Sequence, residues 1–183
     1  IKIISIKPDS QFTKLKINVL GKVHILKLKL IGNFQIENFL AATLACYSSG
    51  ISFEKIFRIC SRIGNPPGRL QLFKKQNKTV IVDYAHTPDA LKTCLLNLRE
   101  QFPDKKITLL FGCGGNRDQT KRSKMGKIAS NYADDIILTN DNPRFENPEK
   151  IRKDIKKGIK KKKIIEISNR AIAISEAIKN LNR

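Results

Sequence analysis

The stretch from Ile107 to Glu146 constrains the fold of this chain more than any other. An apolar segment, ITLLFG, leads into a glycine-rich basic loop, CGGNRDQTKR, then a helical segment, and then a second apolar segment, DDIILT, followed by NDNPRFENP. Two strands joined through a helix predict a parallel pair, and parallel α/β sheets bind ligands beyond the carboxyl ends of their strands. The loops there carry Arg117 and Arg144, whose guanidinium groups fit a carboxylate or phosphate. The stretch therefore predicts an anion-binding site at a sheet edge.

Strand-like and helix-like segments alternate from Leu70 to the end of the chain. This alternation predicts an α/β fold with a parallel sheet and right-handed helical crossovers. The helix that follows His86 should begin at Pro88, with Thr87 as its N-cap. By residue range, the expected strands are 70–75, 79–85, 107–112, 135–140 and 163–168, and the expected helices are 86–102, 120–133, 147–159 and 169–181.

A different pattern precedes this alternation. Apolar and polar residues alternate over 1–31 around a central turn, which predicts two antiparallel strands. Helical spacing of apolar residues follows over 33–50 and 52–63. The corner GNPPGR then ends the second helix, because proline and glycine interrupt helices. We expect a domain boundary at this corner, which divides the chain into 1–69 and 70–183.

The chain is strongly basic. Its 183 residues carry a formal net charge of +20, from 36 Lys and Arg against 16 Asp and Glu, which is typical of proteins that bind polyanions. The lysines are spread through every segment, however, and the densest run, KKGIKKKK at Lys156–Lys163, is interpreted as a solvated helix end and loop. A non-catalytic basic binding module stays open as an alternative, although we expect neither a nucleic-acid nor a membrane partner.

The spacing of the cysteines and the length of the apolar segments indicate in which cellular compartment the protein is expected. Cys46, Cys60, Cys94 and Cys113 lie far apart, without a C-x-x-C motif, which favours buried thiols over a zinc site or a disulfide framework. No stretch approaches the ~20 apolar residues of a membrane span, and the first residues lack the pattern of a signal peptide. We therefore expect a cytoplasmic protein. Because the sequence begins with Ile1, we expect it to be a piece of a longer chain.

Three motifs carry candidate chemistry. In VDYAHTPDAL, Asp83 can accept a hydrogen bond from a ribose hydroxyl, and His86 can lie against a phosphate or base at a helix N-terminus; a turn-stabilising aspartate and a solvated histidine are the alternative. The glycines of GCGGNRD allow positive φ and close approach of a ligand, but the loop is neither a Rossmann fingerprint nor a P-loop. In DNPR, Pro143 restricts Asn142 to extended conformations and so fixes how Arg144 leaves the strand.

The chain resembles the Mur ligase family in six motifs that occur in the family's order: GNFQIENFLAAT, NPPGRLQ, VDYAHTPDAL, GCGGNRD, KRSKMG and DNPRFENP. The resemblance implies the end of a central ATPase domain, to about Arg69, followed by most of a Rossmann-like C-terminal domain. It also implies an ATP-dependent amide ligase of peptidoglycan precursor synthesis. In this family, ATP activates the D-glutamyl carboxylate of UDP-N-acetylmuramoyl-L-alanyl-D-glutamate as an acyl phosphate, which the amino group of a diamino acid attacks.

The resemblance assigns binding roles to residues of two groups. It places the nucleotide beside Asn38, Arg69, Asp83 and His86, with Asp83 near the ribose. It places the incoming amino acid beside Arg117, Asp141, Asn142, Pro143 and Arg144. The arginine of DNPR favours the branch that adds meso-diaminopimelate, because a guanidinium fork pairs with the distal carboxylate of that molecule and L-lysine would leave the fork unpaired. No catalytic residue is assigned within these residues.

The chain also departs from the family pattern. Gln35 stands where the family usually has Asn, and Gln71 stands where the family often has an acid after the P-G-R corner. The resemblance places both residues near the nucleotide, so both substitutions put its contacts in question. The G-T-x-G-K-T loop, the carbamylated lysine and the Mg²⁺ ligands are expected before Ile1, and a K-G-H-E segment after Arg183. We therefore expect a monomer that cannot catalyse alone. Folylpolyglutamate synthesis is an alternative within the superfamily, although DNPR and GCGGNRD suit a dicarboxylate amino acid.

Overall fold

The computed structural model describes residues 1–9, 11–160 and 162–181, and these divide into two compact units. The N-terminal unit combines three segments, Ile1–Leu72, Ile81–Asp83 and Asn97–Pro103. The C-terminal unit contains the rest of the described chain. No helix in the described ranges is long and apolar enough to span a membrane.

The N-terminal unit is built on a three-stranded antiparallel sheet. Its strands, in the order β1-β2-β3, are Lys2–Pro8, Thr13–Val19 and Lys22–Leu28. The expected hairpin corresponds to β2 and β3, whereas the prediction of only two strands over 1–31 was wrong. The sequence of β1, KIISIKP, lacks strict alternation, and its pairing with β2 shifts register between Ile3 and Ser5. A bulged edge strand of this kind does not show the period of two on which strand prediction depends.

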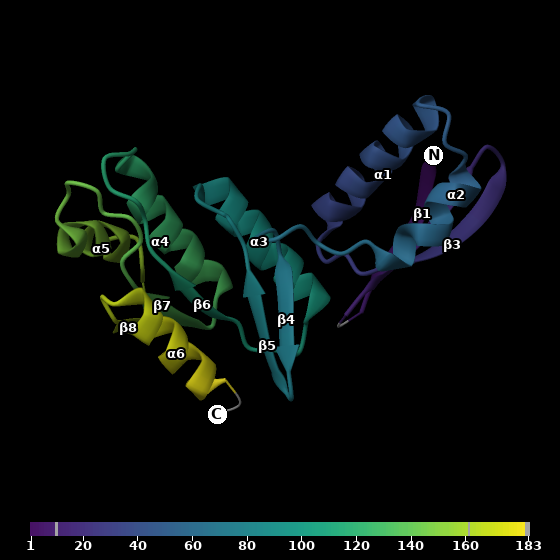
Figure 1. Ribbon diagram of the computed structural model, residues 1–183. Helices are drawn as coiled ribbons and strands as arrows, with labels where there is room; N and C mark the ends of the chain where they lie inside the picture. The colour runs from purple at the N-terminus through teal and green to yellow at the C-terminus, as the bar shows by residue number, and fades with distance from the viewer. Residues whose placement is uncertain (10, 161, 182–183) are drawn as a thin grey trace. The chain divides into compact units, whose positions relative to one another are not determined.

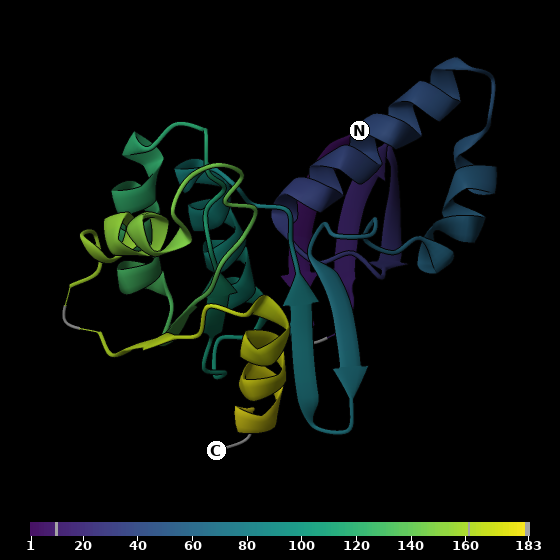
Figure 2. The ribbon, with the colours of Figure 1, turned by 60° about the vertical axis from the view of Figure 1, so that its left-hand side comes forward.

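Helices α1 (Asn33–Ser48) and α2 (Phe53–Ile59) and the short 3-10 helix η1 (Cys60–Arg62) also belong to the N-terminal unit. Figure 2 shows α1 lying across the sheet. The alternate residues of β2 and β3 that face this helix are buried, and they form one core with the apolar face of α1. The buried residues of this core are Leu15, Ile17, Val19, Leu26, Leu28, Leu30, Ile36, Phe39, Phe53 and Cys60.

The C-terminal unit contains a three-stranded parallel sheet in the order β6-β7-β8, as the alternation predicts (Figure 1). Its strands and crossover helices are β6 (Thr108–Phe111), α4 (Thr120–Tyr132), β7 (Asp135–Leu138), α5 (Pro148–Lys156), β8 (Ile164–Glu166) and α6 (Arg170–Asn180). Apolar residues of β6 and β7 pack in one core with those of α4 and α5. The central strand β7 is buried continuously over Ile136, Ile137 and Leu138, which is the pattern of a parallel strand covered on both faces.

Two predicted strands do not join that sheet. Strands β4 (Gln71–Lys75) and β5 (Lys78–Val82) pair with each other in a separate two-stranded sheet, so the prediction of one parallel sheet from Leu70 onward was wrong for this part. Only Gln76 and Asn77 connect them, whereas a parallel pair needs a crossover of about a dozen residues. Gln76 takes up the tight turn with a φ of +53°.

Helix α3 (Pro88–Gln101) begins where the sequence predicts. The amide of Ala90 donates to Oγ1 of Thr87 at 3.3 Å, which is the N-cap bond expected from a threonine before a helical proline. Leu91 and Leu95 of α3 belong to the core of the C-terminal unit.

Candidate functional site

Two loops meet at the carboxyl edge of the parallel sheet. We call them the β6 loop (residues 112–119) and the β7 loop (residues 139–147). The amide of Thr139 donates to the carbonyl of Phe111 at 3.1 Å, and the amide of Gly115 donates to the carbonyl of Asn142 at 2.8 Å. The loops therefore form one continuous surface, as expected for neighbouring parallel strands.

The glycines of GCGGNRD serve this contact between the loops. A Cβ at Gly112 would lie 2.3 Å from the carbonyl oxygen of Thr139, and one at Gly115 would lie 1.9 Å from that of Pro143. Neither glycine has a positive φ. The positive φ that glycine allows is therefore not used at these two positions, where the need for glycine comes from the backbone of the neighbouring loop.

Arg144 is held at the tip of the β7 loop in a left-handed conformation with a φ of +51°. Its amide lies 3.3 Å from Oδ1 of Asn142, and its Nη1 donates to the carbonyl of Gly115 at 2.7 Å. The side chain is otherwise exposed, and its Nε and Nη2 form no hydrogen bond within the described parts of the chain. One edge of the guanidinium is thus anchored, and the other edge, Nε and Nη2, can donate two parallel hydrogen bonds to a carboxylate.

The other residues expected at the amino-acid site lie on the same two loops. Arg117 and Asp141 are exposed, and within the described ranges neither side chain makes a hydrogen bond or ion pair. Asn142 accepts through its carbonyl and its side chain, and the carbonyl of Pro143 accepts from the amide of Glu146 at 3.0 Å. The structure therefore places Arg117 on the β6 loop and Asp141 and Arg144 on the β7 loop, and backbone groups of Asn142 and Pro143 take part in the contacts that shape these loops.

Sequence reasoning missed the residues that hold these loops. Arg122, the third residue of α4, is fully buried, and its Nη2 donates to both carboxylate oxygens of Glu146, each at 2.9 Å. Its Nη1 lies 3.2 Å from Oδ2 of Asp154 on α5. A signal was present, because Arg122 shares the buried face of α4 with Met125 and Ala129, and an arginine on an apolar face needs acidic partners.

Glu146 links these groups to the β6 loop. The amide of Asn116 donates to Oε1 of Glu146, and Oδ1 of Asn116 accepts from the amide of Phe145 at 3.0 Å. The Asn116 amide, and next the Arg122 guanidinium, hold the pKa of Glu146 below its ordinary value. Glu146 is therefore ionised near neutral pH and bridges both loops and α4.

The expected nucleotide-side residues of the N-terminal unit form a second cluster. The side chain of Gln35 is buried; its Nε2 donates to the carbonyl of Arg69 at 3.4 Å, and its Oε1 accepts from Nδ2 of Asn38 at 3.0 Å. Oδ2 of Asp83 accepts from the amide of Leu70 at 2.8 Å. Asn38, Arg69 and Asp83 thus gather around Gln35 and Leu70, with the side chains of Asn38 and Arg69 exposed.

The corner before β4 is fixed by a residue whose role the sequence did not reveal. Asn65 accepts from the amide of Ile31 at 2.9 Å and donates to the carbonyl of Leu70, also at 2.9 Å. Gln71 accepts from the amide of Gly68 at 2.9 Å. These bonds hold the backbone on both sides of Arg69, so Gln71 has a structural partner in the place where the family often has an acid.

His86, the remaining nucleotide-side candidate, belongs to the C-terminal unit. Its ring is exposed, its Nδ1 lies 3.2 Å from the carbonyl of Tyr84, and its own carbonyl accepts from Nζ of Lys121 at 2.9 Å. Within the described residues, no three His, Cys, Asp or Glu side chains gather as a metal site.

Much of the basic run after α5 is engaged in structural contacts. Nζ of Lys156 lies 2.8 Å from Oε2 of Glu166, and Nζ of Lys157 lies 2.7 Å from Oδ1 of Asp154. Nζ of Lys162 donates to the carbonyl of Ala133 at 2.6 Å, and Lys161 lies outside the described residues. These contacts agree with the interpretation of the run as a helix end and loop.

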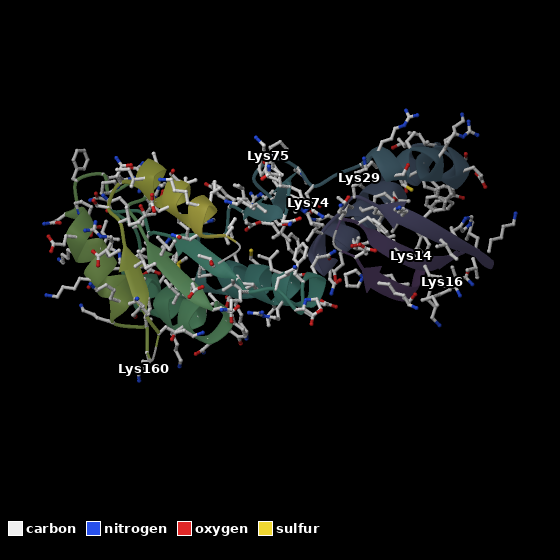
Figure 3. The ribbon with its side chains drawn as sticks, turned by 90° about the horizontal axis from the view of Figure 1, so that it is seen from below. Lys14, Lys16, Lys29, Lys74, Lys75 and Lys160 are labelled. Atoms are coloured by element: carbon white, nitrogen blue, oxygen red, sulfur yellow. The ribbon has the colours of Figure 1, made fainter. Side chains whose placement is uncertain are left out.

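Another part of the positive charge lies on the outer face of the β1–β3 sheet. Figure 3 shows Lys14 and Lys16 together on β2. By register, Lys14 lies opposite Lys7 on β1 and opposite Lys27 on β3. This row belongs to the N-terminal unit, whereas Arg117 and Arg144 belong to the C-terminal unit. Nζ of Lys27 lies 3.9 Å from the centre of the Phe12 ring, a cation–π contact.

Comparison with known proteins identifies the family. The family described as "Mur ligase, glutamate ligase domain" matches residues 68–183. The UDP-N-acetylmuramoyl-L-alanyl-D-glutamate--2,6-diaminopimelate ligase of Rickettsia typhi is 40% identical over 187 residues, which cover 97% of this chain and 38% of that protein. The chain thus spans well under half the length of this relative.

Comparison with solved structures leads to the same family. The structure of a UDP-N-acetylmuramoyl-L-alanyl-D-glutamate--2,6-diaminopimelate ligase matches with a TM-score of 0.71 and 32% identity, over 99% of this chain and 37% of that one. The folylpolyglutamate synthase of Thermotoga maritima matches with a TM-score of 0.76 over 100% of this chain and 41% of that one, but at 22% identity this likeness concerns the fold alone. This chain is a member of the Mur ligase family.

Proposed function

We propose that this chain is part of an ATP-dependent ligase that adds meso-diaminopimelate to UDP-N-acetylmuramoyl-L-alanyl-D-glutamate. The observation that carries the proposal is the anchored, outward-facing guanidinium of Arg144, which shares a continuous two-loop surface with Arg117. The relatives named for this activity, one of them 40% identical to the chain, support the same assignment. The domain division that we propose is a central-domain part over 1–69 and a C-terminal domain over 70–183.

The loop residues account for recognition of a diamino dicarboxylic acid. Arg144, with Nε and Nη2 available, binds the distal carboxylate in a bidentate manner, and Asp141 binds an ammonium group. Arg117 supplies a second cation for the remaining carboxylate. Asn142 and Pro143 act through their backbone, since their contacts keep the two loops together.

Selectivity against L-lysine follows from the charge at Arg144. Lysine has an ammonium at the end of its side chain and no distal carboxylate, so it leaves the fork unpaired and brings a second cation near it. Loss of a charge-assisted hydrogen-bonded pair costs about 1.5–3 kcal/mol, which corresponds to roughly ten- to hundredfold discrimination. The dicarboxylate is therefore the substrate that this surface fits.

The residues assigned to the nucleotide carry polar groups that can bind the base, the phosphates and the ribose of ATP. Asn38 presents a side-chain carbonyl for a base amino group, Arg69 presents a guanidinium for phosphate, and Asp83 lies at the end of β5 for a ribose hydroxyl. ATP, when bound, supplies the phosphoryl group that activates the acceptor carboxylate.

The proposal is tested with Arg144→Lys in the complete ligase. Lysine keeps the positive charge but cannot form two parallel hydrogen bonds with a carboxylate. We expect the KM for meso-diaminopimelate to rise about tenfold or more, the KM for ATP to stay within about twofold, and the preference over L-lysine to shrink.

The matched control is Arg58→Lys, an exposed arginine on α2 with no hydrogen bond or ion pair within the described residues. It should leave all three values unchanged. An unaltered KM for meso-diaminopimelate in Arg144→Lys would contradict the proposal, as would a wild-type enzyme that adds L-lysine equally well.

A further inference from the structure

We propose that Arg122 and Glu146 form a positioning pair that sets the specificity of the amino-acid site by fixing the Arg144 guanidinium. Neither residue faces the proposed ligand surface; they act on it through the β7 loop. The inference rests on the proposed function, and it adds a specificity determinant that lies beneath the binding surface.

The buried guanidinium of Arg122 makes the anchor strong. Arg122 has no exposed side-chain area, and the side chain of Glu146 is only 15% exposed. A buried charge is costly unless it is paired, so the loop carboxylate is drawn to one defined position. Nε of Arg122 has no hydrogen-bond partner, which leaves the contacts with Glu146 and Asp154 as its compensation among the described residues.

The two acidic partners of Arg122 have different consequences. Glu146 belongs to the β7 loop and also accepts from the amide of Asn116 in the β6 loop. Asp154 lies on α5, and its other side-chain partner is Lys157 on the same helix. Only the bond to Glu146 can transmit order to the ligand surface. The bond from Arg122 to Asp154 serves as the control, because it involves the same guanidinium but a residue outside the two loops.

The backbone of the loops needs this anchor. Asn116 and Arg144 both have positive φ, at +50° and +51°, a conformation disfavoured for arginine. Glu146 follows Arg144 by two residues, and the intervening amide of Phe145 is held by Asn116. A strained residue persists only when its surroundings fix it, so the Arg122–Glu146 contact keeps Arg144 in the conformation that reaches Gly115.

A bidentate contact with a carboxylate depends on angle as well as distance, whereas a single charge attraction does not. Release of Glu146 should therefore weaken binding of the distal carboxylate while the charge of Arg144 remains. The expected signature is a change in affinity for the diamino acid and in discrimination against L-lysine, without a comparable change for ATP.

The test compares Glu146→Gln with Asp154→Asn in the complete ligase. Both remove one carboxylate from Arg122 with little change of shape. We expect Glu146→Gln to raise the KM for meso-diaminopimelate about tenfold and to keep the KM for ATP within about twofold. We expect Asp154→Asn to leave both KM values unchanged, even if it lowers the Tm as much as Glu146→Gln does. Arg122→Lys should raise the KM for meso-diaminopimelate as Glu146→Gln does, and combining the two changes should raise it little further, since both break the Arg122–Glu146 contact.

A measurement that needs no substrate separates this inference from the proposed function. Hydrogen exchange of the unliganded enzyme should be faster at the amides of Asn116 and Phe145 in Glu146→Gln than in Asp154→Asn. Equal exchange in the two variants, or KM changes that merely follow Tm in both, would overturn the positioning role. A wild-type enzyme that prefers another amino acid would instead contradict the proposed function, and the KM comparison would then be made with that amino acid.

Discussion

Nη1 of Arg144 and the carbonyl oxygen of Gly115 lie 2.7 Å apart, so a side chain of one loop is bonded to the backbone of the next. This bond turns the arginine back toward the sheet edge instead of leaving it free in solvent. A guanidinium immobilised before the ligand arrives loses less side-chain freedom on binding. The relationship ties the proposed recognition of a carboxylate to the contact between the glycine-rich β6 loop and the β7 loop.

Gly115→Ala should destabilise the C-terminal unit. The added Cβ would lie 1.9 Å from the carbonyl oxygen of Pro143, and a backbone atom cannot move aside without separating the loops. We expect a loss of about 2–3 kcal/mol in the free energy of unfolding, measured by urea denaturation. Gly64→Ala is the control, because its nearest neighbour would be 3.8 Å away, and it should stay within about 0.5 kcal/mol.

Acid should destabilise the C-terminal unit through Glu146 and Asp154. Bonds from Asn116 and Arg122 lower the pKa of Glu146, and bonds from Lys157 and Arg122 lower the pKa of Asp154. A carboxyl with a depressed folded pKa contributes stability above its ordinary pKa and loses it as pH falls through the folded value. Stability should therefore be level near neutral pH and fall below about pH 4.5, the ordinary value for glutamate.

The denaturation midpoint measured from pH 7 to pH 3 checks this dependence. Glu146→Gln should be less stable at pH 7 and should lose less on acidification than the wild type. Parallel curves for the two proteins would show that Glu146 is not a source of the acid sensitivity.

Asn65→Ala should weaken the N-terminal unit and the nucleotide site together. The change removes the bonds to Ile31 and Leu70 and leaves those backbone groups without their partner at the corner that positions Arg69. We expect a loss of about 2 kcal/mol in stability and a raised KM for ATP in the complete ligase. Asn131→Ala, on the exposed face of α4, is the control and should change neither value.

Cys113 should resist alkylation in the folded protein. Burial raises the pKa of its thiol to about 11, so little thiolate exists at pH 8. Its sulfur packs 3.7 Å from that of Met125, out of reach of a reagent. Iodoacetamide labelling followed by peptide mass spectrometry should find the partly exposed Cys46 modified first, and Cys113 only after unfolding. Early labelling of Cys113 would mean that the β6 loop opens readily.

The sequence predicted the elements that have a clear period or a clear boundary. The parallel strands β6, β7 and β8, the Thr87 cap of α3 and the meeting of the two arginine-bearing loops all follow from local patterns and from the geometry of parallel sheets. The hairpin of β4 and β5 was misassigned because strand content alone does not name a pairing partner. The short connection at Gln76 could have excluded a parallel pair.

The interactions between distant residues were beyond the sequence. Arg122 and Glu146 are 24 positions apart, and neither stands in a motif that requires the other. Gln35 was interpreted as a departure from the family pattern and Asn65 as part of a turn. Gln35 donates to the carbonyl of Arg69, and Asn65 bonds both backbone groups of Ile31, in each case 34 positions away. Such pairings depend on how the helices and loops pack.

The interleaved segments of the N-terminal unit have a consequence for protein engineering and for the exchange of modules between ligases. A fragment ending at residue 69 would lack the carboxylate of Asp83 that bonds the amide of Leu70, and it would lack the Asn97 side chain that accepts from the amide of Asn33 at 2.6 Å. A transplanted N-terminal unit keeps its own contacts only if it carries the chain through Pro103. Recombination between related enzymes should therefore succeed more often beyond that residue than at the proline-rich corner.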